Sequence, residues 1–162
     1  MTYNVEFKGQ WNLNLPLNNN HRLYLIQFSN IRHMKRDVNK VEFIPDDLRT
    51  SVGLTIGTDA EFFVGGGGSF GQERDVSILN YNKPPSTQPG LWNGWVPNSN
   101  GTAIIWDEIE NFYNYVDWIQ YMIKNFFNPW GYILNGDIAW QGNSLKDTGI
   151  INIENNIINL KR

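Results

Sequence analysis

The stretch EFFVGGGGSFGQERDVSILNYNKPPSTQPGLWNGW, residues 61–95, decides how the rest of the chain is organised. It is the longest part of the sequence without a clear helix or strand pattern, and a connection of this length inside a compact domain is usually functional or disordered. Disordered chain is poor in aromatic and branched apolar residues, whereas this stretch is rich in both. We therefore interpret residues 61–95 as an ordered binding loop and the remaining chain as its scaffold.

Upstream of the loop, the sequence predicts one strand and one main helix. Residues 3–15 alternate apolar and polar side chains, which is the period of a half-buried strand, and Gly9 marks a candidate bulge. Asn18 is the predicted N-cap of a helix over residues 19–36, where apolar residues recur at spacings of three and four. Shorter elements are a predicted helical turn at 45–49 and extended segments at 52–56 and 61–64.

Downstream of the loop, the sequence predicts a hairpin, a second helix and a group of strands. Residues 91–96 and 102–106 are apolar segments separated by an Asn-Gly step, which is a hairpin signal. Asp107 and Glu110 have the spacing of a capping box, so a helix is expected from Asp107 to about Phe127. The predicted C-terminal strands cover residues 132–141, 148–154 and 157–160, with a tight turn at Asn155–Asn156.

This order of elements predicts an α+β fold in which an antiparallel sheet carries two main helices on one face, with a long central loop. The specific prediction is a ferredoxin-like βαββαβ core with extra C-terminal strands, in a single domain over residues 1–162. A different α+β sandwich is the alternative.

Composition and charge exclude several classes of function. The chain has 162 residues, no cysteine and a net charge of −3, so neither disulfides nor a thiolate nucleophile are available, and the charge argues against binding of a nucleic-acid polymer. The N-terminus, MTYNVEFKGQW, lacks the pattern of a signal peptide, and no apolar run has the length of a membrane helix. We expect no membrane partner and a cytoplasmic location.

Two catalytic or cofactor motifs match the glycine tract as bare strings. The string GGSFG around Ser69 resembles the G-x-S-x-G elbow of serine hydrolases, but His21 and His33, the two histidines of the chain, both precede it, whereas that fold places its histidine later. The glycines also match G-x-G-x-x-G, but the Pro84–Pro85 step leaves no room for the helix that a dinucleotide site requires. Two histidines and no cysteine suggest no metal site. We predict no catalytic residue, no metal and no cofactor.

What the loop does offer is a site for an anion with a flat ring. Consecutive glycines can direct several backbone N–H groups at one anion, arginines pair with phosphate or carboxylate, and aromatic rings stack on bases. Side-chain amides can read the edge of a base. The alternative is a glycine loop over a core that contains both tryptophans. The predicted ligand-binding residues are Arg32, Arg36, Gly67, Gly68, Phe70, Gln72, Arg74, Tyr81, Trp92 and Trp95.

Five strings along the chain resemble a widespread family of small, tryptophan-rich bacterial and phage proteins: RHMKRD, FFVGGGGSFGQERD, NYNKPPSTQPGLWNGWVP, FYNYVDWIQYMI and NPWGYILNGDIAWQG. The resemblance supplies no catalytic residues. The phage setting that it implies suggests a protein of anti-defence, a sponge that sequesters cyclic-nucleotide immune signals in the cytoplasm of the bacterial host. Several proteins of that kind are small, oligomeric and not enzymes.

The leading hypothesis is therefore non-enzymatic binding of a small anionic ligand, a nucleotide or cyclic nucleotide, by a homo-oligomer. Aromatic loop residues can be covered at a symmetric interface, and a ligand pocket can span it. The alternative is a protein-interaction module, such as an immunity protein or an inhibitor of a host factor, because the exposed, proline-rich PPSTQPGLW segment has the anchors of such interfaces. An enzyme that uses unassigned carboxylates is a third possibility.

Overall fold

The computed structural model describes residues 4–66 and 72–162, and its contacts divide the chain into two compact units. Unit 1 contains the chain up to Asn18 together with Gly94–Arg162, and unit 2 contains Asn19–Asn93. The loop singled out from the sequence falls almost wholly in unit 2, while the single domain over residues 1–162 stays a prediction. None of the helices in the described part of the chain is long and apolar enough to span a bilayer.

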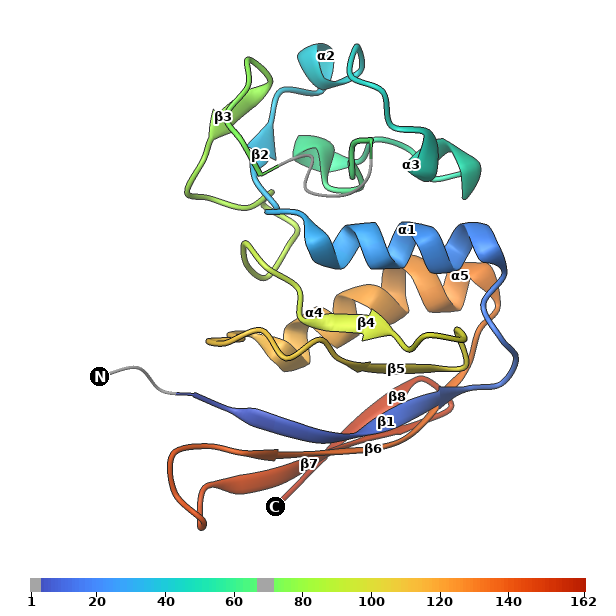
Figure 1. The fold of residues 1–162 in the computed structure, drawn as a ribbon, viewed down its shortest axis with the longest axis vertical. Coiled ribbons are helices and arrows are strands. Elements are labelled where there is room, and N and C mark those ends of the chain that lie inside the picture. The colour runs from blue at the N-terminus through green and yellow to red at the C-terminus, as the bar shows by residue number, and fades with distance from the viewer. Residues whose placement is uncertain (1–3, 67–71) are drawn as a thin grey trace. The chain divides into compact units, whose positions relative to one another are not determined.

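Unit 1 is built on an antiparallel sheet, as predicted. Within the described residues the sheet has six strands in the order β4-β5-β1-β6-β7-β8, and every neighbouring pair is antiparallel (Figure 1). The α+β class is confirmed. The strands are β1 (Glu6–Leu13), β4 (Trp95–Pro97), β5 (Ala103–Trp106), β6 (Leu134–Gln141), β7 (Thr148–Glu154) and β8 (Ile157–Lys161).

The hairpins of this sheet follow the turn signals of the sequence. β4 pairs with β5 across the predicted turn, and β7 pairs with β8 across Asn155 and Asn156, which have φ of 49° and 66°. Asparagine tolerates this left-handed region, so the pair closes a two-residue turn. The bulge expected at Gly9 is absent, because β1 pairs with β6 without a break. Gly9 has φ of 110°, and a Cβ there would lie 2.5 Å from the carbonyl oxygen of Asp137.

The second predicted helix begins eight residues later than expected. It consists of α4 (Tyr115–Met122), a π-helical turn (Ile123–Phe127) and α5 (Asn128–Trp130). Asp107 forms no capping box; its side chain accepts a hydrogen bond from the backbone N–H of Ile109, two residues on. Asn114 has φ of 58°, which a helix interior does not allow. A local bond such as that between the Asp107 side chain and the N–H of Ile109 competes with helix formation.

Aromatic side chains form the core of unit 1. The Trp95 ring is fully buried and lies 5.0 Å from Phe7, 4.7 Å from Trp11 and 5.1 Å from Phe112, measured between ring centroids. Its indole N–H donates to the carbonyl oxygen of Tyr115, the first residue of α4. The helix therefore lies against the sheet face that carries Phe7 and Trp11.

Unit 2 contains short elements around one longer helix. The structure corrects the predicted helix over residues 19–36, because α1 ends at Asn30 and the chain then becomes extended. The segments 52–56 and 61–64 are not strands. The elements are α1 (Asn19–Asn30), β2 (Lys35–Arg36), α2 (Val38–Val41), α3 (Asp47–Ser51), the 3₁₀ turn η1 (Thr58–Ala60) and β3 (Ile78–Asn80).

The extended segment after α1 is held by the long loop. Alternate backbone N–H groups, those of His33, Lys35 and Asp37, donate to the carbonyl oxygens of Leu91, Lys83 and Ser77 at 2.8, 2.9 and 2.7 Å. An extended segment presents every second N–H to one side, so the loop supplies the partners that a further helical turn would have supplied. This pairing holds residues 77–91 of the loop in place although they contain little regular structure.

Replacing Trp95 by alanine is expected to destabilise the protein by roughly 3–5 kcal/mol, because it removes a large buried ring and leaves a cavity. Trp92, which is 36% exposed, provides the matched control, and its replacement by alanine is expected to change the melting temperature much less. Thermal unfolding of both variants decides the question. Equal losses of stability would show that Trp92 also belongs to a core.

Candidate functional site

Tyr81 lies at the centre of the candidate site, because two guanidinium groups lie over its ring. The Cζ atom of Arg32 is 4.2 Å from the ring centroid, and that of Arg74 is 4.4 Å away. Both distances are typical of cation–π contacts. Arg32 follows α1 and Tyr81 follows β3, so the fold brings together residues that are far apart in the sequence.

Hydrogen bonds fix the geometry of this group. Arg32 donates through Nε to the carbonyl oxygen of Tyr81 (3.0 Å) and through a terminal nitrogen to Oδ1 of Asn82 (3.2 Å). The Tyr81 hydroxyl donates to the carbonyl oxygen of Gln72 (3.3 Å), and Nε2 of Gln72 donates to that of Asn30 (2.6 Å). Four residues that the sequence predicted therefore meet, and we call Arg32, Gln72, Arg74 and Tyr81 the Tyr81 cluster.

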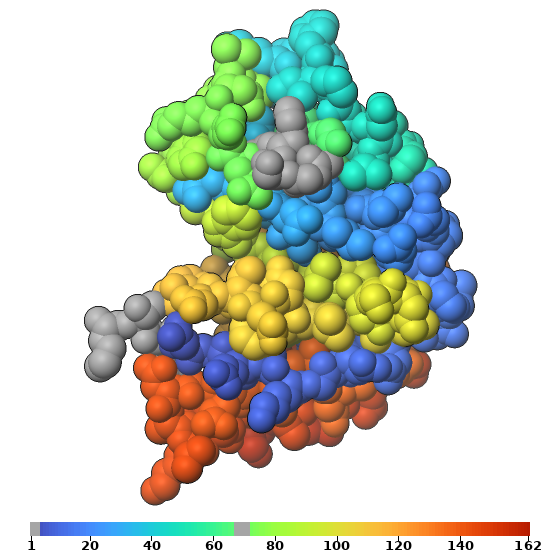
Figure 2. Space-filling model, in the orientation of Figure 1, coloured from blue at the N-terminus to red at the C-terminus, as the bar shows by residue number. Residues whose placement is uncertain are grey.

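The Tyr81 cluster carries positive charge that forms no ion pair with a carboxylate of the described residues. The ion pairs within residues 4–66 and 72–162 involve other cations, namely Arg36, Arg49 and Arg162. Arg32 and Arg74 share one ring, so their charges are separated by no more than the sum of the two ring distances. Arg74 is exposed, and the green chain around β3 forms part of the surface of unit 2 (Figure 2). A local concentration of unpaired cations attracts anions.

Arg36, by contrast, is held within the fold by an ion pair and hydrogen bonds, and its assignment to the ligand site stays a prediction. Its side chain is 3% exposed, donates to Asp75 (2.9 Å) and Ser77 (2.8 Å), and lies 4.6 Å from the ring centroid of Phe63. Burial alone raises the pKa of Asp75, but hydrogen bonds from Ser77 and Arg36 outweigh it, so the pKa is lowered. This ionised pair ties β2 to the chain that precedes β3.

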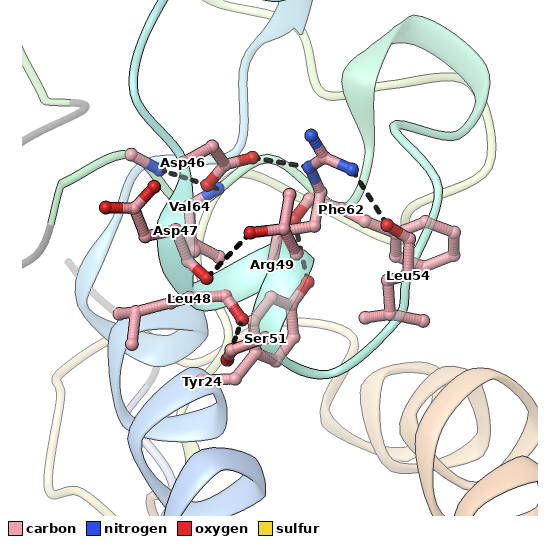
Figure 3. Close-up of polar contacts among 11 residues, drawn as sticks. Tyr24, Asp46, Asp47, Leu48, Arg49, Ser51, Leu54, Phe62 and Val64 are labelled. Atoms are coloured by element: carbon pink, nitrogen blue, oxygen red, sulfur yellow. Dashed lines mark hydrogen bonds and ion pairs between the residues drawn. The ribbon is translucent and has the colours of Figure 1, made fainter.

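A buried carboxylate anchors the start of the glycine tract. Oδ1 of Asp46 accepts hydrogen bonds from the backbone N–H groups of Val64 (3.1 Å) and Gly65 (2.9 Å), and Oδ2 accepts from Nε of Arg49 (2.6 Å). Arg49 also donates to the carbonyl oxygen of Leu54 (2.8 Å), so the network connects three parts of the chain (Figure 3). Burial raises the pKa of Asp46, against the hydrogen bonds from Arg49, Val64 and Gly65, which lower it.

Sequence reasoning missed this anchor. Asp46 is expected at a helix N-terminus, and it does precede α3, but its side chain makes no capping hydrogen bond. It accepts instead from N–H groups 18 and 19 residues further along the chain. No local pattern reports a contact at that separation. The first glycine of the tract thus presents its N–H to a protein carboxylate, not to a ligand.

The remaining predicted site residues fall in three places. Trp92 follows Leu91, whose carbonyl oxygen accepts from His33, so it lies on the chain beside the segment that begins with Arg32. Trp95 is fully buried in the core of unit 1, as in the alternative that makes it a core residue, and its assignment to the ligand site stays a prediction. Gly67, Gly68 and Phe70 lie outside the described residues.

His33 is a buried neutral histidine behind the Tyr81 cluster. Its Nε2 is 2.7 Å from the carbonyl oxygen of Phe28, and its ring centroid is 4.3 Å from that of Phe28. Burial lowers its pKa to about 4, against the Phe28 hydrogen bond, and the charge of Arg36 lowers it further. His33 therefore supports the chain between Arg32 and Arg36 and is no acid or base at neutral pH.

Catalytic and metal chemistry find little support in the part of the chain that the structure describes. Asp107 has a pKa raised by burial to about 6, although the N–H of Ile109 opposes that rise. Such a pKa suits a general base, but a lone carboxylate lacks a nucleophile or a second acid. No group of three or more histidine, aspartate or glutamate residues is placed to hold a metal ion among the described residues.

No family model, curated protein or solved structure matches this chain.

Replacing Asp46 by alanine is expected to destabilise the protein by roughly 3–5 kcal/mol, because it leaves the partly buried Arg49 charge and two N–H groups without their carboxylate partner. Asp46→Asn should cost less, since its amide oxygen still accepts from Val64 and Gly65. The exposed neighbour Asp47 is the control, and Asp47→Ala should leave the chemical-denaturation midpoint almost unchanged. An Asp46→Ala variant as stable as the Asp47→Ala variant would contradict the anchor.

The lowered pKa of His33 predicts that the folded protein loses stability in acid. Its pKa is lower in the folded protein than in the unfolded chain, so its contribution is complete above about pH 6.5 and is lost as the pH falls toward 4. The full effect is roughly 3 kcal/mol. His33→Gln keeps a donor for Phe28 and should flatten this part of the stability–pH curve, whereas His21→Gln should change it less. Unfolding followed from pH 7 to pH 4 measures both, and coincident curves for wild type and His33→Gln would refute the assignment.

Proposed function

We propose that the protein binds and sequesters a small anionic ligand, of the nucleotide or cyclic-nucleotide class, at the Tyr81 cluster and without catalysis. The observation that carries the proposal is the pair of arginines over one tyrosine ring, neither neutralised by a carboxylate of the described chain. The aromatic face orients the guanidinium groups while their charge remains available to an anion. A pre-oriented guanidinium loses little freedom when it binds phosphate.

A nucleotide suits this site better than a simple anion because the surroundings offer more than charge. The Asn82 amide oxygen accepts from Arg32, and the Gln72 amide bonds to the carbonyl oxygen of Asn30, two residues before Arg32; amides of this kind can bond to the edge of a base. Trp92 is partly exposed on the loop segment beside Arg32, where its ring can stack on a base. A ligand with both a phosphate and a flat ring would use all three kinds of contact.

The charge distribution supports a small ligand over a polymer. The protein as a whole has a net charge of −3, and nucleic-acid binders normally present extended basic surfaces. Unit 2 holds eight of the thirteen basic residues but also eight of the sixteen acidic ones, so the positive charge is local to the Tyr81 cluster and not spread over the unit. A patch of this size neutralises one or two phosphates.

The resemblance to small bacterial and phage proteins adds a biological setting to this proposal. In that setting the ligand is a nucleotide signal of bacterial immunity, and binding by this protein withdraws the signal from the receptor.

The proposal predicts that a nucleotide panel contains a ligand that raises the melting temperature. At 100 times its dissociation constant, a ligand stabilises the folded state by ~2.7 kcal/mol. Arg74→Ala should weaken binding mainly at low salt, because salt screens exposed charges, whereas Trp92→Ala should weaken it by roughly 1–3 kcal/mol at any salt. Thermal shift and calorimetry at two salt concentrations measure both effects.

Arg22→Ala is the matched control, because Arg22 is also in unit 2 but its guanidinium bonds to Asn19, outside the Tyr81 cluster. This variant should bind as the wild type does. The proposal fails if no nucleotide at millimolar concentration shifts the melting temperature, or if Arg22→Ala and Arg74→Ala weaken binding equally. Turnover of the bound ligand would refute the non-enzymatic part alone.

A protein partner is the second candidate, favoured by apolar side chains at the surface of the same unit. Val76 and Leu79, on either side of Ser77, are 82% and 60% exposed, and Phe43 is 83% exposed. Exposed apolar patches often mark interaction sites. Recovery of one stoichiometric protein from a host lysate, lost in a Val76→Asp/Leu79→Asp variant and retained in Arg74→Ala, would favour an immunity protein or host-factor inhibitor.

For the fold, we infer a ferredoxin-like core with two added C-terminal strands. Its support is the strand order β4-β5-β1-β6. The crossover through α1 joins β1 to β4, which have β5 between them, and the crossover through α4 joins β5 to β6, which have β1 between them. This split arrangement is typical of the class. An experimental structure in which β1 does not lie between β5 and β6 would exclude it.

A further inference from the structure

The β8 strand leaves one edge of the unit 1 sheet open. Within residues 4–66 and 72–162, β8 pairs with β7 alone and ends the strand order. The opposite edge, β4, is three residues long and includes Pro97, and short strands and proline are ordinary means of blocking an edge. β8 contains no proline, and Ile157 and Leu160 are 65% and 64% exposed.

The hairpin register shows which backbone groups face this open edge. Glu154 pairs with Ile157 across the two-residue turn, and Asn152 pairs with Asn159. In such a hairpin the pair beside the turn is hydrogen-bonded, and bonded pairs alternate with non-bonded ones. Ile157, Asn159 and Lys161 therefore direct their N–H and C=O groups to β7, whereas Ile158 and Leu160 direct theirs outward.

The side chains of β8 divide between the two faces of the sheet. Ile158 and Leu160 pair with Ile153 and Ile151, which are fully buried, so they lie on the apolar face. Asn159 lies on the other face, where its Nδ2 donates to Oδ1 of Asn152 (3.2 Å). Nδ2 of Asn152 in turn donates to Oδ1 of Asp137 (2.6 Å).

This row of amides ends at the open edge. The Asn159 amide has two N–H groups and an oxygen, of which one N–H is used within the described chain. The next strand in the row would therefore need to offer both an acceptor and a donor at this position, and another asparagine amide offers both.

A groove runs along the apolar face beside β8. It has a volume of about 510 Å³, and its walls come from α4 with the following π turn on one side and from β8 on the other. The apolar lining is formed by Val116, Ile123, Ile158 and Leu160, and Lys124 is its charged member. Apolar side chains of an added strand can enter this groove.

We propose that a second copy of this chain pairs with β8 in antiparallel orientation, with Asn159 opposite Asn159 of the partner subunit. In this register Ile158 lies opposite Leu160 of the partner subunit, and Leu160 opposite Ile158 of the partner subunit. These are the residues whose backbone groups face outward, so two bonded pairs form. The apolar side chains meet apolar side chains, and the two Asn159 amides can bond reciprocally and continue the row from Asp137.

This self-complementarity selects a second copy over an unrelated strand. A twofold axis requires that, wherever residue i of one copy lies opposite residue j of the other, residue j also lies opposite residue i. β8 satisfies this rule for its backbone bonds, its apolar pairs and its central amide. The inference concerns unit 1 and does not depend on ligand binding in unit 2.

Sedimentation velocity over a range of concentrations tests the interface. The wild type should form dimers at micromolar concentration, and Leu160→Lys should raise the dissociation constant at least tenfold, because it places a charge in an apolar pair. Leu145→Lys is the matched control, since Leu145 is 84% exposed and lies outside β8, and it should dimerise as the wild type does. A wild type that remains monomeric at 100 micromolar would overturn the proposal.

The register has its own test, because the chain contains no cysteine. Directly opposed residues of a non-bonded antiparallel pair have Cα atoms about 4.5 Å apart, within the range of a disulfide. Asn159→Cys should therefore form a disulfide-linked dimer under mild oxidation, while Ile157→Cys, whose symmetry mate lies four residues away, should not. Equal cross-linking of both variants, or dimers that survive Leu160→Lys and do not cross-link through position 159, would show that another surface mediates association.

Discussion

The order of unit 2 depends on one set of backbone hydrogen bonds, those from alternate residues of the segment after α1 to the long loop. His33, Lys35 and Asp37 donate, and Leu91, Lys83 and Ser77 accept. A buried N–H without a partner costs free energy comparable to a lost hydrogen bond. The chain can leave the helix at Asn30 because residues 77–91 of the loop supply these partners, and the same bonds hold those residues in place.

The candidate site follows from that pairing. Arg32 lies at the start of the extended segment and Tyr81 lies on the loop. The backbone pairing of these two segments brings the Arg32 guanidinium over the Tyr81 ring. Arg36, four residues further, is directed into the interior, where Asp75 neutralises it. Two arginines that look equivalent in the sequence thus differ in role. The one without a carboxylate partner carries the charge that an anionic ligand can use.

The two units use their aromatic residues differently. In unit 1 the rings of Phe7, Trp11 and Trp95 interlock at centroid distances near 5 Å and form the core. In unit 2 the ring of Tyr81 remains near the surface and supports two cations. High aromatic content alone therefore does not identify a binding loop, because the same residue types serve packing in one unit and charge orientation in the other.

The sequence by itself determined the elements whose signals are local. Alternation of apolar residues located β1, the Asn-Gly and Asn-Asn steps located two hairpins, and the predicted C-terminal strands agree with β6, β7 and β8. It also brought forward Arg32, Gln72, Arg74 and Tyr81, because arginines, amides and aromatic residues around glycines are a recognisable chemical group.

Tertiary structure decided where local preference met a stronger distant partner. The apolar spacing that favours helix through Arg36 gave way to backbone bonds with residues forty or more positions away. The Asp46 side chain, at the N-cap position of α3, bonds to Val64 and Gly65 and does not cap the helix. Trp95, next to the loop in sequence, was drawn into the core of unit 1 by Phe7 and Trp11. Burial and long-range hydrogen bonds depend on which segments meet, and one-dimensional patterns do not contain that information.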